Sequence, residues 1–184
     1  MLRKDLKKNE LDEILEGKGD FVQIDYLNRF IKLFPPIGMR KYAYLKLARI
    51  YLDKEMFSDA ATMFNNAAIN SLTFKEKQEN YVKEAKCFVR ALKFEEAGRA
   101  LKKGFAEANE KEKNELYNEL LDYYKKEGER LLKEKKSNQA AQIYERLIRM
   151  KVSNEDKLSF KEILLDLYQK LGKTKEYSFL KSLN

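Results

Sequence analysis

Apolar residues recur along most of the chain at intervals of three and four positions, the spacing of one face of an α-helix. Glycine, proline and capping residues interrupt this pattern, and Pro35 with Pro36 cannot continue the helix that precedes them. No stretch shows the alternating pattern of a strand. The pattern therefore predicts an all-α fold, with helices over about 2–17, 20–34, 39–54, 58–68, 73–92, 95–108, 111–135, 137–148, 153–172 and 174–183.

Several helix starts carry capping signals. Thr73, followed three residues later by Glu76, has the spacing of a capping box, and Ser153 opens a helix in the same way. Ser58 and Ser137 are also expected to act as N-caps. These signals predict that each longer helix is followed by a partner after a short turn.

The helix pairs repeat one pattern of residue sizes. Each copy has an aromatic, a small and a bulky residue on its first helix, then a small, a bulky and a small or apolar residue on its second. Small residues let two helices approach closely, and bulky ones fill the space between them. One pair cannot bury its own apolar face, so pairs must stack. The three copies are Tyr44, Ala48, Tyr51, Ala60, Phe64 and Ala67; Tyr81, Ala85, Phe88, Ala97, Leu101 and Gly104; and Tyr124, Gly128, Leu131, Ala140, Tyr144 and Leu147.

This pattern resembles the tetratricopeptide repeat (TPR) over about Lys41 to Val152, although tyrosine stands where that family has tryptophan. The usual leucine before the small residue is kept at Leu47 but is replaced by Glu84 and Glu127. The long, uneven first helices are similar to those of the soluble NSF attachment protein-like subtype. The resemblance implies a right-handed superhelix of antiparallel helix pairs, a TPR-like solenoid. We expect one domain over 1–184, with N-terminal helices in 1–38, three repeats in 39–152 and capping helices in 153–184.

Composition argues against catalysis. Histidine is absent, which removes catalytic triads, imidazole acid–base chemistry and histidine metal ligands. Cys87 is the only cysteine, so no intramolecular disulfide or cysteine-based metal site can form. Glycine-rich phosphate loops are missing as well. We expect no enzymatic activity, no catalytic residue, no cofactor and no metal.

The net charge of +8 comes from 38 basic and 30 acidic residues and is spread along the chain. A basic chain can bind nucleic acid, but 29 of these residues are lysine and only 9 are arginine, the residue favoured for phosphate and base recognition. No segment is apolar enough to span a membrane, and no apolar signal segment follows the start. We expect a soluble cytoplasmic protein of unknown oligomeric state.

The resemblance also implies where a partner would bind. In the TPR family the first helix of each pair lines a concave groove that takes extended or helical peptides. The 18 corresponding positions hold 8 basic and 4 acidic residues with apolar residues among them, and this net positive charge suits an acidic, amphipathic peptide or helix. The predicted groove residues are Tyr42, Leu45, Lys46, Arg49, Val82, Lys83, Lys86, Arg90, Lys125, Lys126 and Lys133.

Two other interpretations remain open at this point. The basic positions can simply be solvated helix faces, where lysine and glutamate are common and pairs four residues apart add only a few tenths of a kcal/mol. The alternative function is a basic helical repeat that binds nucleic acid, with an affinity that falls steeply with salt. The favoured hypothesis is a non-catalytic adaptor for protein binding.

Overall fold

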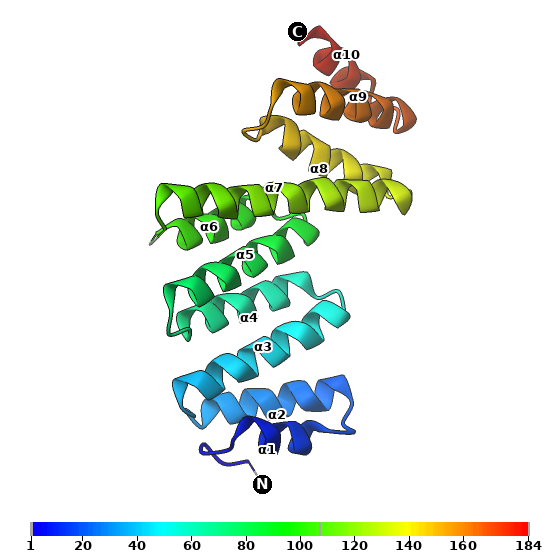
Figure 1. Cartoon of the computed structure of the whole chain (residues 1–184). Coiled ribbons are helices and arrows are strands. Elements are labelled where there is room, and N and C mark those ends of the chain that lie inside the picture. Colours follow the sequence, from blue (N-terminus) through cyan, green and yellow to red (C-terminus); the bar gives the residue numbers. More distant parts are fainter. Residues whose placement is uncertain (1, 107, 184) are drawn as a thin grey trace. The chain divides into compact units, whose positions relative to one another are not determined.

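The computed structural model describes residues 2–106 and 108–183, and over these residues the protein is built from α-helices without strands (Figure 1). This confirms the all-α prediction, and the helix bounds agree with the predicted ones to within a few residues at most ends. The helices are α1 (Lys8–Leu15), α2 (Asp20–Lys32), α3 (Ile37–Asp53), α4 (Phe57–Ile69), α5 (Phe74–Arg90), α6 (Phe94–Phe105), α7 (Glu110–Lys133), α8 (Ser137–Arg149), α9 (Asn154–Lys170) and α10 (Thr174–Ser182).

Two of the predicted N-caps are confirmed and two are wrong. The Thr73 hydroxyl accepts a hydrogen bond from the amide of Glu76 at 3.2 Å, and the Ser153 hydroxyl caps α9 in the same way. Ser58 and Ser137 lie inside the first turns of α4 and α8, whose N-caps make no side-chain capping bond. A tight turn precedes each of these two helices, and its backbone places the N-cap one or two residues before the serine.

The chain falls into two compact units, unit 1 ending at Leu116 and unit 2 beginning at Tyr117 within α7. In unit 1, α3 packs against α2 and α4, and α5 packs against α4 and α6. In unit 2, the last turns of α7 pack against α8, where Gly128 lies against Tyr144 and Ile143. α9 packs against α8 and α10, and the rings of Tyr144 and Phe160 lie 5.9 Å apart.

The repeated positions form the contacts between helices. All eighteen are buried except Tyr44, Tyr51, Tyr81 and Phe88, which are half-buried. The alanines among them have no exposed surface, as expected where two helix backbones approach closely. The small and bulky positions therefore pack as the sequence pattern predicts.

The turn between the two helices of a pair recurs with one backbone conformation. Glu55, Leu92, Lys135 and Gly172, which lie 37, 43 and 37 residues apart, have positive φ between 56° and 66°. In each turn the following amide donates to a carbonyl five residues earlier; the lysine at 93, for example, donates to Phe88 at 2.9 Å. This is the Schellman ending of a helix. The shared turn and its spacing, together with the packing of adjacent helices, are compatible with a helical repeat.

Candidate functional site

The predicted groove positions of unit 1 lie on α3 and α5. An ion pair joins the two helices, with Lys41 Nζ 2.7 Å from Glu76 Oε1. We use the name first-helix face for those residues of α3 and α5 at the predicted groove positions that a ligand can reach. It consists of Leu45, Arg49, Leu52, Glu79, Lys83, Lys86 and Arg90, all of which are exposed or half-buried.

Helix α1 occupies one edge of the predicted groove. The Tyr42 hydroxyl donates to Asp12 at 2.6 and 2.8 Å, and Lys46 Nζ lies 2.9 Å from the same carboxylate. Lys8 and Lys46 each place an ammonium 5.3 Å from the Tyr42 ring centroid. Tyr42 and Lys46 therefore hold α1 in place, an interaction that sequence reasoning missed because it joins polar residues 30 positions apart.

Asp12, Tyr42 and Lys46 form a cluster in which the negative charge of Asp12 is balanced by Lys46. Burial alone would raise the pKa of Asp12, but hydrogen bonds from Tyr42 and Lys46 and the charge of Lys46 hold it below its usual value. Burial and the neighbouring carboxylate raise the pKa of Tyr42. The hydrogen bond to Asp12 raises the pKa of Lys46 against the effect of burial. The Lys46 charge is therefore balanced within the protein.

Val82 has little surface to offer a ligand. Its side chain is only 1% exposed, and Val89 on the same side of α5 is fully buried. The groove assigned from the family pattern thus includes an apolar residue that belongs to the core. The apolar residues of the first-helix face that can contact a ligand are the half-buried Leu45 and Leu52 of α3.

A charged cluster crosses from α5 to α4 and α6. Glu84, only 5% exposed, accepts two hydrogen bonds from Lys103 Nζ at 2.7 and 2.9 Å. The same ammonium donates to Asn65 Oδ1 at 2.8 Å and lies 5.2 Å from the Tyr81 ring centroid. Burial raises the pKa of Glu84, and the bond and charge of Lys103 counteract part of that rise.

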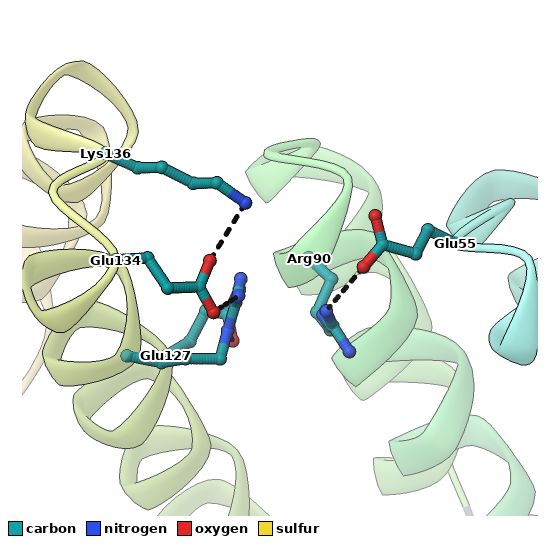
Figure 2. A network of polar contacts seen from close by, with 6 residues as sticks. Glu55, Arg90, Glu127, Glu134 and Lys136 are labelled. Carbon is teal, nitrogen blue, oxygen red and sulfur yellow. Dashed lines mark hydrogen bonds and ion pairs between the residues drawn. The ribbon is translucent and has the colours of Figure 1, made fainter.

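The remaining basic residues of the first-helix face differ in exposure. Arg49 and Lys83 are exposed, whereas Lys86 and Arg90 are half-buried. The Arg90 guanidinium stacks 4.2 Å from the Phe57 ring centroid and lies 3.9 Å from Glu55 (Figure 2). Arg49 and Lys83 are thus the cations most accessible to a ligand on this face.

In unit 2, the predicted groove residues lie on α7. Lys125 Nζ is 3.0 Å from Asp156 Oδ2 and 5.7 Å from the Phe160 ring centroid, so it links α7 to α9. Lys126 and Lys133 are exposed. Lys125 therefore has a structural partner, and the other two lysines are accessible.

The second glutamate of the repeat pattern, Glu127, is 5% exposed, like Glu84. Arg130 donates to it through two nitrogens, at 2.6 and 2.9 Å, and also binds Glu134. Lys136 Nζ lies 2.9 Å from Glu134, and Figure 2 draws this ion pair as a dashed line. The hydrogen bonds from Arg130 to these carboxylates raise the pKa of Arg130 above its usual value, although burial opposes the rise. The cluster contributes charges of both signs to this end of α7.

The described residues show no arrangement for metal-based or thiol chemistry. Between 2–106 and 108–183, no three His, Cys, Asp or Glu side chains are grouped so that they could hold a metal ion. Burial raises the pKa of the Cys87 thiol to about 12, so the thiolate nucleophile is disfavoured. Over the same residues, the structure contains no helix of the length and apolarity that crossing a bilayer requires.

Comparisons with models of protein families, with curated proteins and with solved structures found no match to this chain.

Proposed function

We propose that this protein is a non-catalytic scaffold for protein–protein interaction, built as a TPR-like, right-handed superhelix of antiparallel helix pairs. Its ligand is an acidic, amphipathic peptide or helix, bound on the first-helix face. The recurring turns and the buried small residues support the repeat architecture. A cytoplasmic location is part of the same proposal and rests on the sequence.

One observation carries the binding hypothesis. On the first-helix face, the exposed Arg49 of α3 lies one helical turn from the half-buried Leu45 and Leu52, and Lys83 is exposed on α5. A ligand that presents carboxylates around an apolar side chain complements this combination in charge and in hydrophobicity. An extended or helical peptide can supply both kinds of group at the required spacing.

The charge distribution favours a protein ligand over nucleic acid. Several cations near the predicted groove have carboxylate partners, with Lys41, Lys46 and Lys125 each within 3.0 Å of one. A phosphate backbone is bound by rows of cations that neutralise successive charges. Ion pairs within the protein interrupt such a row and leave short cationic patches.

To test the proposal, ligands are selected with the purified wild-type protein from a phage-displayed library of short random peptides. Their binding to the wild type is compared with binding to the double variant Arg49→Glu/Lys83→Glu. A matched control, Lys4→Glu/Lys32→Glu, makes the same change in net charge at exposed positions of unit 1 outside the face. We expect the wild type and the control to enrich peptides with Asp or Glu around a large apolar residue. The face variant should bind those peptides about tenfold or more weakly.

Three results would contradict the proposal. The first is enrichment of peptides without acidic residues, and the second is an equal loss of binding in the control variant. The third is tight binding of single-stranded RNA with an affinity that falls steeply as salt rises, which indicates phosphate neutralisation and supports the nucleic-acid alternative.

A further inference from the structure

A small pocket lies in unit 1 between the first turns of α5 and the last turn of α6. Its volume is about 190 Å³. The wall on α5 is formed by Phe74, Lys77, Gln78 and Tyr81, and the α6 side is closed by Lys103, Gly104 and Ala106. The pocket thus has aromatic walls and two lysines, of which Lys103 is already paired with Glu84, and it lies against a residue that has no side chain.

The repeat pattern shows which residues take the place of Gly104 in the other helix pairs. Gly104 is the last position of the second copy, and the equivalent positions hold Ala67 in the first copy and Leu147 in the third. The Leu147 side chain is fully buried in unit 2. A Cβ atom built on Gly104 would lie 3.7 Å from both Tyr81 Cβ and Leu116 Cδ1, which is ordinary van der Waals contact. The third helix pair therefore buries a leucine at a position where the second has a glycine in the lining of the pocket.

The size of the pocket restricts its occupant. Sites for small molecules usually measure about 300–1,000 Å³, and this pocket is smaller. It suits one aliphatic side chain, which a peptide can insert as an anchor while its backbone stays outside.

The surroundings add apolar surface and positive charge. Ile69, Leu72 and Phe74, at the corner between α4 and α5, are 60%, 71% and 62% exposed. Lys77 Nζ lies 5.6 Å from the Phe74 ring centroid and Lys103 lies at the opposite wall. Exposed apolar residues grouped beside a pocket are typical of an interaction surface. Lys103 is already bound to Glu84, so it is Lys77 that favours a carboxylate next to the anchor.

We propose that this pocket binds a single leucine-sized side chain from a partner peptide whose neighbouring residues are acidic, taking the place that Leu147 fills in the third helix pair. The site is separate from the first-helix face. At about 100° per residue, Phe74, Gln78 and Tyr81 lie about half a turn around α5 from Glu79, Lys83 and Arg90. The proposal therefore holds or fails independently of binding on that face.

The experiment uses a defined probe on the full chain. An acetylated peptide amide with a central leucine and two glutamates on each side is titrated into isotopically labelled protein, followed by amide NMR. We expect the largest shifts at Gln78 and Gly104. Replacing the central leucine by alanine should weaken binding at least about tenfold, because most of the apolar contact is lost. A peptide with lysines in place of the glutamates should bind more weakly than the original.

Three variants separate the pocket from the rest of the surface. Gly104→Leu fills the pocket from within and should abolish the shifts at Gln78, with a thermal unfolding curve recorded to confirm that the variant is folded. Lys77→Glu changes only a half-buried cation at the rim and should weaken binding several-fold. Arg49→Glu/Lys83→Glu should leave the titration unchanged.

Equal binding of the leucine and alanine peptides would overturn the proposal, as would full binding by a folded Gly104→Leu variant. Shifts confined to residues of the first-helix face would also overturn it, because they would assign the peptide to the other surface. Loss of binding in Gly104→Leu with binding retained in Arg49→Glu/Lys83→Glu supports the pocket even if the first-helix face has no ligand.

Discussion

Gly104, in the last turn of α6, and Gly128, inside α7, provide a test of the packing, because their surroundings differ. Gly104 of α6 and Gly128 of α7 both occupy small positions of the repeat pattern and both are buried. A Cβ atom on Gly104 would meet its nearest neighbours, Leu116 and Tyr81, at 3.7 Å. On Gly128 it would lie 3.2 Å from two ring atoms of Tyr144 and 3.3 Å from Ile143 Cγ2. We predict that alanine stabilises the first position and destabilises the second.

The magnitudes follow from two opposing effects. Replacing glycine by alanine inside a helix stabilises by about 0.5–1 kcal/mol, because glycine loses more backbone entropy on folding. At Gly104 no contact opposes this gain. At Gly128 the neighbours are only 2% and 0% exposed, so they cannot move away without disturbing the core. Overpacking of this kind costs about 1–3 kcal/mol, which leaves a net loss of about 1–2 kcal/mol.

The assay is thermal unfolding of Gly104→Ala, Gly128→Ala and the wild type, followed by circular dichroism. In a chain of this length about 1 kcal/mol corresponds to about 2–4 °C. Gly104→Ala should raise the midpoint by a few degrees and Gly128→Ala should lower it by about 2–8 °C. Urea unfolding gives the free energies directly. Equal shifts of the same sign in the two variants would refute the packing derived for these helix pairs.

Three further predictions concern the turns and the ion pairs. Gly172→Ala should lower the free energy of unfolding by about 1 kcal/mol, and Lys135→Gly should raise it by a similar amount, because both residues have positive φ. Urea unfolding measures both changes, and a lower free energy of unfolding in Lys135→Gly would contradict this reasoning. Lys103→Met leaves the buried Glu84 carboxylate without its cation and should cost about 1–3 kcal/mol near neutral pH. Because the pKa of Glu84 is raised, its protonated form is favoured in the fold, and the destabilisation caused by Lys103→Met should become smaller as the pH falls. An equal destabilisation at about pH 4 would contradict the ion pair between Glu84 and Lys103 as its cause. The pKa of Asp12 is lowered in the fold, so its ionised carboxylate stabilises the protein above the unfolded pKa, and this stabilisation is lost as pH falls through the folded pKa. Asp12→Asn should therefore be less stable than the wild type near neutral pH and equal to it in strong acid. Unfolding measured as a function of pH checks this.

The helices were predictable from sequence because burial along one helix face imposes a period that is visible without any knowledge of the neighbours. The spacing of Tyr81, Ala85 and Phe88 marks one side of α5, and that side is buried or half-buried. Thr73 and Ser153 were identifiable as caps because the hydrogen bond is local, three residues away.

The candidate site was less predictable. Assigning Val82 to a groove required knowing which apolar residues of α5 face another helix, and periodicity does not contain that information. The contact of Asp12 with Tyr42 and Lys46 depends on how α1 meets α3, and surface ion pairs leave no periodic signal. The positive φ of Leu92 was hidden for a related reason, since turn propensity favours glycine there.

The four Schellman turns have a consequence for the evolution of such chains. Glutamate, leucine, lysine and glycine adopt the same left-handed conformation at the equivalent position, so the bend does not require glycine. A hairpin of this kind can be duplicated, and its sequence can then diverge freely at the bend at a cost of only about 1–2 kcal/mol per non-glycine residue. Ancestral duplications can therefore persist in backbone geometry after their sequence identity has been lost.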